Sequence, residues 1–375
     1  MKTKLKVVTV IGTRPEIIRL SEVIRACDRA FDHILIHTGQ NWDYTLNEIF
    51  FKDLELRAPD RYLNVVGADL GETMGNIIAA SYTMLKEMQP DALLVLGDTN
   101  SALCAIPAKR LKIPIFHMEA GNRCFDQNVP EEINRKIVDH IADINLPYTE
   151  HSRRYLLSEG FRKEHIFVTG SPMTEVIQRN MEKIKSSKAL EVYGVEKGKY
   201  FVLSMHREEN VDIEYKFKEL VRALDAIAET YGLPIIFSTH PRTWKRLDAE
   251  GAKLNPLIQQ VKPLSFTDYC RLQIDAKCVI SDSGTLSEES AILRFPAVLL
   301  RNSTERPEAV DKGSIVIGGY TAESLSQSIA LAIDFFDGKD HLPADYFDEA
   351  VSAKVVKIIQ GYTSIINKVI WDKYI

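Results

Sequence analysis

The most constraining feature of this 375-residue sequence is a series of short apolar runs, each closed by Gly, Asp, His or Pro and separated from the next by an amphipathic stretch. Uninterrupted apolar runs that alternate with amphipathic segments are typical of parallel strands covered by helices on both faces. The runs are KVVTVIGT, HILIHTGQ, ALLVLGDT, PIFHMEAG, INLPYT and IFVTGSP in the first half, and YFVLSMHR, PIIFSTHP, CVISDSG, AVLLRNS and SIVIGG in the second. The pattern predicts an α/β fold of two doubly wound, Rossmann-like domains.

Two domains are expected because a typical domain spans roughly 100–200 residues. We place the first at residues 1–172 and the second at residues 173–357, with a lysine-rich helix and loop just after the boundary. A final helix begins near Ser352, and its residues from about 358 to 375 are expected to pack back on the first domain. The clearest other helical stretches are residues 16–29, 72–89, 215–231 and 286–294.

The composition excludes some classes of partner. The net charge of −5 argues against a nucleic-acid-binding protein, but it leaves room for a small anionic ligand held by local cations. No apolar run approaches the ~20 residues that span a bilayer. The five cysteines are scattered and form no CxxC pair, which fits a reducing compartment. We therefore expect a cytoplasmic protein that binds neither nucleic acid nor membrane.

Polar residues follow the predicted strands at their carboxyl ends, where the ligands of doubly wound folds bind. Both halves of the chain contribute such residues, so we expect the two domains to face one ligand cleft. The polar segments are GTR at 12–14, GDT at 97–99, EAG at 119–121, HR at 206–207, HPR at 240–242 and SDSGT at 281–285.

The stretch SDSGTLSEES follows a predicted strand and opens a predicted helix. Ser283, Gly284 and Thr285 would offer backbone N–H groups and hydroxyls to a phosphate, yet the same residues also suit a plain helix cap. Glu289 suits either the dipole of the first turn or the hydroxyls of a ribose. The stretch alone leaves both interpretations open.

Two further segments with cationic side chains also allow either a ligand-binding or a purely structural interpretation. GTRPEIIRL places Arg14 and Arg19 at and just inside a helix start, and arginine is a natural partner for a diphosphate. From this motif alone, a pair of solvent-facing arginines is the simpler interpretation. His206 ends a predicted strand beside Arg207, where it is either a buried, hydrogen-bonded histidine or part of a polar cleft.

The segment HMEAGNRCFDQNVPEEINR gathers acids directly after an apolar run. Its Glu119 and Glu131, with Asp98 from the GDT segment, would lie near the rim of one cleft. Neighbouring carboxylates repel one another, so some of their pKa values should rise and let them exchange protons. Residues 128–132 also suit a helix start, where acids serve as caps, and spacing alone does not decide.

Several cofactor and metal motifs are missing from the sequence. No GxGxxG follows a strand, so a nicotinamide cofactor is not expected. The GxxxxGK[ST], GxSxG and HExxH patterns are also missing. We expect neither a cofactor nor a metal ion.

Eight motifs occur in one order along nearly the whole chain: GTRPE, GDTNS, HMEAGNR, VPEEINR, HREEN, STHPR, SDSGTLSEES and STERPE. Together they resemble the non-hydrolysing UDP-N-acetylglucosamine 2-epimerase family, which has the two-domain glycosyltransferase-B fold. The resemblance implies a cofactor-independent isomerase that binds a UDP-linked N-acetylamino sugar and forms a homodimer. HTGQNWDYTLNEIFFKDLEL and HMEAGNRCFDQNVPEE resemble a narrower group, the capsule and O-antigen enzymes that interconvert UDP-2-acetamido-2,6-dideoxy-L-talose and UDP-N-acetyl-L-fucosamine.

The family reaction inverts C2 by elimination and re-addition. A base removes the C2 proton as the C1–O bond to UDP breaks, and UDP then adds back to the glycal while a proton reaches the other face of C2. By motif position, the resemblance implies a catalytic set of Asp98, Glu119, Glu131 and His206. It implies substrate binding by Arg14, Arg19, Arg135, His240, Arg242, Ser283, Gly284, Thr285 and Glu289.

The sequence departs from the family pattern at three places. Arg19 stands where the family usually has lysine, which keeps the charge but changes the geometry. Residues 40–44 read QNWDY where many members carry a Gln-His-Arg-Glu-type segment that contacts an activating second sugar nucleotide, so activation by substrate is not implied. Residues 122–129 also differ, and the identity of the hexose rests on them.

Three alternatives to the L-talose epimerase remain open from the sequence. The first is an epimerase that interconverts UDP-N-acetylglucosamine and UDP-N-acetylmannosamine. The second is a hydrolysing relative that releases UDP and free sugar. The third, from another class, is a sugar-nucleotide binding module without epimerase activity.

Overall fold

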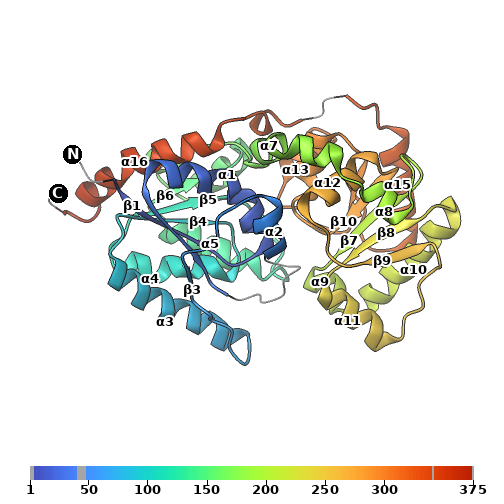
Figure 1. Ribbon diagram of the computed structural model, residues 1–375, viewed down its shortest axis with the longest axis horizontal. Helices are drawn as coiled ribbons and strands as arrows, with labels where there is room; N and C mark the ends of the chain where they lie inside the picture. Colours follow the sequence, from blue (N-terminus) through green and yellow to red (C-terminus); the bar gives the residue numbers. More distant parts are fainter. Residues whose placement is uncertain (1–3, 40–47, 340–341, 374–375) are drawn as a thin grey trace. The chain divides into compact units, whose positions relative to one another are not determined.

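The computed structural model describes residues 4–39, 48–339 and 342–373, which form two compact units (Figure 1). The units divide at Gln178 and Ala344, compared with the predicted divisions at residues 172 and 357. Unit 1 comprises Met1–Arg123, Pro130–Gln178 and Asp345–Ile375, and unit 2 comprises Cys124–Val129 and Arg179–Ala344. The short segment Cys124–Val129 is therefore grouped with unit 2 although its neighbours in sequence belong to unit 1.

Unit 1 is built on a six-stranded parallel sheet with the strand order β3-β2-β1-β4-β5-β6. Its central strand β4 is buried along its whole length, as expected for a strand covered by helices on both faces. The strands are β1 (Lys6–Ile11), β2 (Asp32–His37), β3 (Arg61–Tyr62), β4 (Ala92–Leu96), β5 (Ile115–Met118) and β6 (Ile144–Leu146).

The helices of unit 1 begin where the sequence provides start signals. α1 follows Thr13, which is extended, and Pro15 occupies its first turn, where a missing N–H costs no hydrogen bond. α3 follows Asp69, whose carboxylate accepts the Glu72 N–H at 2.8 Å. The C-terminal helix α16 packs against α1. The helices are α1 (Arg14–Ala30), α2 (Glu48–Asp53), α3 (Leu70–Met88), η2 (Asn100–Cys104), α4 (Ala105–Arg110), α5 (Glu131–Ile141), α6 (Glu150–Ser158), η3 (Lys163–His165) and α16 (Val351–Val369), with α7 (Met173–Ser186) and η4 (Ala344–Tyr346) at the divisions between the units.

Unit 2 contains a second six-stranded parallel sheet, in the order β12-β11-β10-β7-β8-β9. Counted from its own first strand, this order is the same as that of unit 1. The strands are β7 (Phe201–Met205), β8 (Ile235–Thr239), β9 (Ile258–Val261), β10 (Cys278–Ser281), β11 (Ala297–Leu299) and β12 (Val316–Ile317). The helices are α8 (Ala189–Tyr193), α9 (Glu208–Val211), α10 (Glu214–Tyr231), α11 (Pro241–Glu250), α12 (Phe266–Asp275), α13 (Leu286–Leu293), α14 (Pro307–Asp311) and α15 (Ala322–Asp334).

Each sheet has its own core. In unit 1, Val8 and Leu93 of the central strands pack with Leu85 of α3 and Val138 of α5. In unit 2, the rings of Phe201 and Phe237 pack with Phe217 and Leu224 of α10. Two independent cores explain why the two halves show the same alternation of apolar runs and helices.

The fold class predicted from the sequence is confirmed, with two parallel sheets flanked by helices. The four predicted helical stretches correspond to α1, α3, α10 and α13. One predicted strand is wrong: IFVTGSP contributes only an isolated bridge between Ile166 and Asn145. Strands β3 and β9 were missed because β3 has two exposed residues and β9 contains two exposed glutamines.

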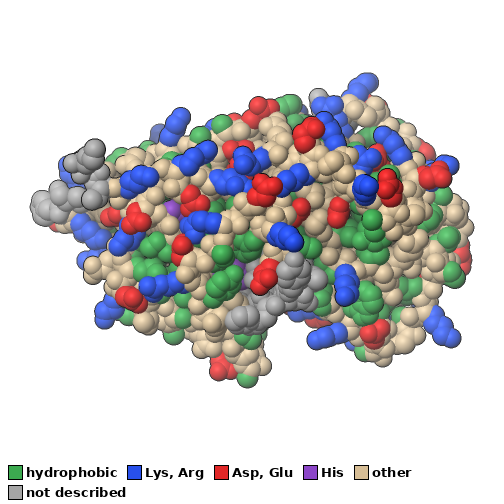
Figure 2. Space-filling view, in the orientation of Figure 1, with side chains coloured by type: hydrophobic (Ala, Val, Ile, Leu, Met, Phe, Trp, Pro, Cys, Tyr) green, Lys and Arg blue, Asp and Glu red, His purple; other side chains and the backbone are tan. Residues whose placement is uncertain are grey.

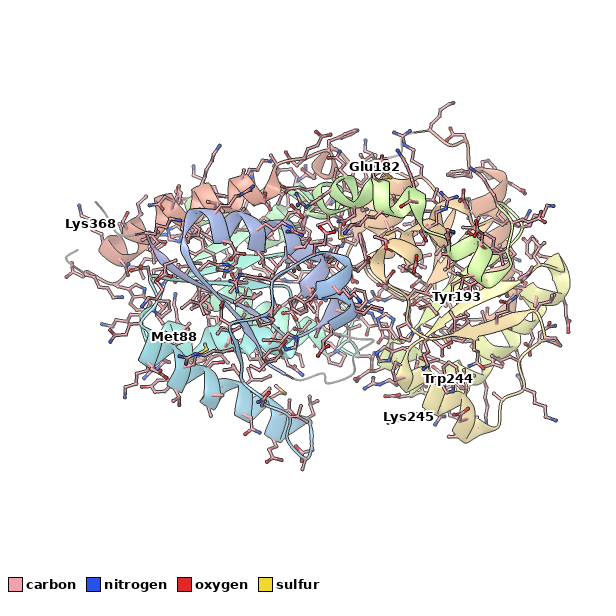
Figure 3. The ribbon with its side chains drawn as sticks, in the orientation of Figure 1. Met88, Glu182, Tyr193, Trp244, Lys245 and Lys368 are labelled. Carbon is pink, nitrogen blue, oxygen red and sulfur yellow. The ribbon has the colours of Figure 1, made fainter. Side chains whose placement is uncertain are left out.

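The surface carries charges of both signs. On the face drawn in Figure 2, lysine and arginine side chains are interspersed with aspartate and glutamate rather than gathered into a basic stripe. Figure 3 labels Met88, the last residue of α3, whose carbonyl accepts a hydrogen bond from Nζ of Lys6 at the start of β1. α3 therefore ends at the amino edge of the sheet, away from the strand ends that carry the predicted site. Among the described helices, none combines the length and the apolar character needed to cross a membrane.

Candidate active site

The two sheets place the predicted site residues at equivalent positions. In a sheet of this order, ligands bind where the strand order reverses, outside the carboxyl ends of the two central strands. In unit 1 this point lies between β1 and β4, which lead into Arg14 and Asp98. In unit 2 it lies between β7 and β10, which lead into His206 and Asp282.

Asp98 follows β4 and is held by an arginine of α5. Its Oδ2 accepts Nε of Arg135 at 2.9 Å and lies 2.7 Å from Nη2 of the same guanidinium. Nη1 of Arg135 lies 2.8 Å from Oε2 of the buried Glu132. Arg135 is itself buried, so its charge is balanced by two carboxylates and its planar group fixes the direction of the Asp98 side chain.

Glu119 follows β5, the neighbour of β4, and has an unusual backbone. Its φ is +63°, in the left-handed region that costs a non-glycine residue of the order of 1–3 kcal/mol. Its buried carboxylate is paired with Arg19 of α1 and accepts Nδ2 of Asn122 at 3.2 Å. A Cβ added to Gly97 would lie 3.5 Å from Oε2 of Glu119. The carboxylate of Glu119 therefore lies directly beside the turn that carries Asp98.

Glu131 is the first residue of α5, one helical turn before Arg135. Residues four apart share a face of a helix, so Glu131 lies on the side of α5 that carries Arg135. The helix start predicted at residues 128–132 is confirmed. Unit 1 thus gathers Asp98, Glu119, Arg19 and Arg135 at the ends of β4 and β5, with Glu131 on the adjoining helix.

The structure adds a carboxyl group to unit 1 that the sequence did not single out. Glu16 in the first turn of α1 is buried, and its Oε2 accepts the Gly12 N–H at 3.0 Å and the Thr13 hydroxyl at 2.8 Å. Its Oε1 accepts the hydroxyl of Ser101 in η2. Burial raises the pKa of Glu16 to about 7, because these hydrogen bonds only partly offset the loss of solvation. Glu16 thereby joins the loop after β1 to the loop after β4.

His206 in unit 2 is paired with a buried aspartate. Nδ1 of His206 lies 3.0 Å from Oδ1 of Asp282, which is fully buried after β10. The same carboxylate accepts the backbone N–H groups of His206 and Arg207 at 3.0 and 2.9 Å, and Nδ2 of Asn210 at 3.1 Å. Burial raises the pKa of Asp282, but the His206 imidazole and the backbone donors outweigh it and bring the pKa down to about 2.

The predicted phosphate-binding residues form the start of α13. The hydroxyls of Ser283 and Thr285 lie 2.9 Å apart, and Thr285 is the N-cap residue. A Cβ added to Gly284 would meet Oε1 of Glu305, so a larger side chain there would displace this carboxylate. Glu305 in turn pairs with Arg301 at 2.6 Å and with Arg207 at 3.3 Å, which places two guanidinium groups close to this helix start. The motif STERPE thus contributes a charged residue here that the sequence did not single out.

The remaining predicted ligands of unit 2 occupy more varied places. His240 caps α11 by accepting the Arg242 N–H on Nδ1 at 3.2 Å, and its ring centroid lies 5.9 Å from that of His206. The side chain of Arg242 is turned to Glu208 at 2.7 Å. Glu289 is buried and accepts Nε2 of Gln273 at 2.7 Å. His240 therefore lies beside His206, whereas Arg242 and Glu289 are engaged with neighbouring side chains.

In unit 1, Arg14 begins α1 and its guanidinium lies 5.8 Å from the centre of the Phe50 ring. The segment 40–44, which bears on activation by a second nucleotide, lies outside the described residues. Across residues 4–39, 48–339 and 342–373, no group of three or more His, Cys, Asp or Glu side chains is placed to hold a metal ion.

Two doubly wound parallel sheets, each with polar residues at the point where its strand order reverses, define the glycosyltransferase-B class of folds. The sequence matches the family model described as UDP-N-acetylglucosamine 2-epimerase over residues 25–360. A relative from Methanocaldococcus jannaschii, named UDP-N-acetylglucosamine 2-epimerase, is 37% identical over 88% of this chain and 93% of its own length. A Pseudomonas aeruginosa protein named UDP-2,3-diacetamido-2,3-dideoxy-D-glucuronate 2-epimerase is 31% identical over 86% of this chain and 91% of its own.

Solved structures agree with the sequence matches. The UDP-N-acetylglucosamine 2-epimerase of Rickettsia bellii is 44% identical, with a TM-score of 0.91 over 99% of this chain and 100% of that one. The M. jannaschii enzyme in complex with UDP-GlcNAc and UDP is 34% identical, with a TM-score of 0.89 over 95% of this chain and 100% of that one. The chain belongs to the UDP-N-acetylglucosamine 2-epimerase family. It is an isomerase that acts as a UDP-sugar 2-epimerase.

Proposed function

We propose that the enzyme inverts C2 of a UDP-linked N-acetylamino sugar by eliminating and re-adding UDP, and that its substrate is UDP-2-acetamido-2,6-dideoxy-L-talose, converted to UDP-N-acetyl-L-fucosamine for capsule or O-antigen synthesis. The observation that carries the reaction is the placement of Asp98 and Glu119 at the ends of two paired strands, each with its own arginine. The two acids suit proton transfer at C2, because each can be held in place while its charge changes.

The proposed chemistry conserves atoms and charge. One carboxylate among Asp98, Glu119 and Glu131 takes the C2 proton, the C2–H electron pair forms the C1=C2 bond, and the C1–O pair leaves with UDP. Arg19 and Arg135 limit the repulsion among the carboxylates as positive charge develops at C1. A second acid then gives a proton to the opposite face of C2 as the UDP oxygen rejoins C1.

We propose that unit 2 holds the nucleotide. Ser283, Gly284 and Thr285 would bind the diphosphate at the start of α13, and Glu289 would bind the ribose. His206 would act on the leaving diphosphate oxygen, because Asp282 fixes Nδ1 and leaves Nε2 as the working atom. Arg14, His240 and Arg242 would add further contacts to the phosphates and the nucleotide.

The choice of hexose is proposed to rest on residues 122–129. Phe125 in this segment has a φ of +56° and is 65% exposed, so its backbone directs a large apolar ring outward. An apolar ring complements the 6-methyl group of a 6-deoxy sugar better than a 6-hydroxyl. The names of the M. jannaschii and R. bellii proteins favour the second candidate, interconversion of UDP-N-acetylglucosamine and UDP-N-acetylmannosamine.

A panel of UDP-hexosamines with and without the 6-hydroxyl, followed by NMR in D2O, tests the proposal. We expect conversion of the 6-deoxy-L-talose compound, one deuterium at C2 of the product, and no net release of UDP. Product that retains only protium at C2 would contradict the elimination route. Accumulation of UDP and free sugar would instead identify a hydrolysing enzyme, and conversion of UDP-N-acetylglucosamine alone would favour the second candidate.

We also propose that the enzyme is a cytoplasmic homodimer, on the strength of the family resemblance. Light scattering on the purified protein tests whether it is a dimer, by comparison with the chain mass of 42.5 kDa. A single species at the mass of one chain over the working concentration range would contradict it.

A further inference from the structure

Behind the acids of unit 1 lies a fully buried charged cluster. Asp139 in the third turn of α5 has no solvent exposure, and both of its carboxylate oxygens accept the Gly121 N–H at 3.2 Å. Its Oδ2 also accepts Nη1 of the buried Arg123 at 2.7 Å. Gly121 is two residues after Glu119, so Asp139 holds the backbone of the turn that carries this acid.

His117 links the Asp139 carboxylate to the turn after β4, which carries Asp98. Nδ1 of the buried His117 lies 2.9 Å from Oδ1 of Asp139, and Nε2 of His117 lies 2.8 Å from the carbonyl oxygen of Gly97. A carbonyl oxygen can only accept, so Nε2 of His117 carries a proton and donates it. Gly97 immediately precedes Asp98, and this contact therefore fixes the backbone from which Asp98 projects.

A second branch of the cluster reaches the carboxylate of Glu119 itself. Nη1 of Arg123 donates to the carbonyl of Asn122 at 2.7 Å, and the hydroxyl of Ser152 donates to Oδ1 of Asn122 at 3.0 Å. These two contacts leave Nδ2 of Asn122 directed at Oε1 of Glu119. Because Glu119 holds a disfavoured backbone conformation, its position depends on such outside restraints.

We propose that Asp139, acting through His117 and the Gly121 N–H, is a positioning residue that sets the spacing between Asp98 and Glu119. Asp139 contacts neither acid. It contacts Gly121 in the turn that carries Glu119, and through His117 it is linked to Gly97 in the turn that carries Asp98. The inference rests on the proposed function, because it concerns the same pair of acids.

The first test compares Asp139→Asn with Asp143→Asn. Asp143 is a matched control: it is also a buried aspartate, it accepts the Ile115 N–H at 2.9 Å and it pairs with Lys109 at 2.5 Å, but at the amino end of β5. We expect Asp139→Asn to lower kcat about 100-fold with little change in KM, since a misplacement of about 1 Å has this effect. Asp143→Asn should keep kcat within about twofold while lowering the thermal midpoint comparably.

The second test exploits the two nitrogens of His117. In His117→Gln the amide nitrogen reaches the place of Nε2 and keeps a donor for the Gly97 carbonyl. In His117→Asn the amide nitrogen takes the place of Nδ1 and the contact to Gly97 is lost. We expect the Gln variant to retain about tenfold more kcat than the Asn variant at equal thermal stability, the worth of one buried hydrogen bond.

The outcomes separate the inference from the proposed function. Equal kcat for Asp139→Asn and Asp143→Asn, or equal kcat for the two His117 variants, would overturn the positioning role. If Asp139→Asn does not fold, the His117 pair decides alone. If the wild-type enzyme converts none of the UDP-hexosamines, the proposed function fails first, and calorimetric binding of UDP shows whether the protein was intact.

Discussion

The two units share one strand order, and each buries a carboxyl group where that order reverses, yet the two groups differ in acidity. Glu16 in unit 1 has its pKa raised by burial to about 7, whereas Asp282 in unit 2 has its pKa lowered to about 2. Glu16 receives one backbone N–H and two hydroxyls. Asp282 receives two backbone N–H groups and an amide and lies beside an imidazole.

The difference teaches that topology fixes where a carboxyl group lies but not its charge. Neutral donors compensate poorly for lost hydration, so Glu16 can gain a proton near neutral pH. Asp282 has the adjacent His206 imidazole in addition to its neutral donors, and the imidazole lowers its pKa most, so Asp282 stays ionised and anchors His206.

Removal of an acid from unit 1 is expected to have the largest effect. Glu119→Gln and Asp98→Asn should each lower kcat by at least about 1,000-fold, the upper part of the range for acid–base groups, because neither amide takes up the C2 proton. Calorimetry should show that UDP still binds both variants. Glu182, which is labelled in Figure 3 and is 91% exposed, provides the control variant Glu182→Gln with unchanged kcat. Turnover within tenfold of wild type in either variant would remove that acid from proton transfer at C2.

The pH dependence of stability tests the acidity of Glu16. Its pKa is higher in the folded than in the unfolded chain, so the folded state binds more protons and stability falls as pH rises from about 4.5 to 7. Relative to Glu16→Gln, which mimics the protonated acid, wild type should lose about 3 kcal/mol across this window. Urea unfolding of both proteins at several pH values measures the difference. Parallel curves for the two proteins would show that Glu16 keeps an ordinary pKa.

The contribution of Asp282 to the pH dependence of stability should have the opposite sign to that of Glu16 and a smaller amplitude. Its pKa is lower in the folded chain, so its contribution is complete above the unfolded value of 3.8 and is lost as pH falls toward 2. The stability advantage of wild type over Asp282→Asn should therefore shrink by about 2 kcal/mol between pH 5 and 2. The same urea series measures it. A stability advantage of wild type that grows as the pH falls would show that folding raises the pKa of Asp282 rather than lowering it.

The smallest expected effect concerns the start of α13. Ser283→Ala removes one hydroxyl that would face the diphosphate, and the dissociation constant for UDP should rise about tenfold, the worth of one charge-assisted hydrogen bond. Ser290→Ala is the control, because the Ser290 hydroxyl bonds within the same helix to the Ser287 carbonyl at 3.3 Å. Equal UDP affinity in the two variants would remove Ser283 from the binding site.

Much of the fold could be predicted, because apolar runs and helix caps are local signals. The acids at strand ends could also be predicted: Asp98 and Glu119 follow β4 and β5 because parallel strands end at one edge. The partners of these acids could not. Asp139 meets Gly121 and His117 only when α5 folds over β5, and no spacing in the sequence encodes that contact. For the same reason the sequence did not single out Glu16, because its contact with Ser101 depends on the fold.

The path of the chain has a practical consequence for dissecting the enzyme. Asp345–Ile375 belongs to unit 1, and its helix α16 packs on α1. A fragment that ends at Gln178 would therefore lack α16. The complementary fragment would carry that helix without its packing partner and would lack Cys124–Val129. No single scission yields two whole modules: replacing unit 2 by that of a relative takes two grafts, Cys124–Val129 and Arg179–Ala344, and replacing unit 1 takes three.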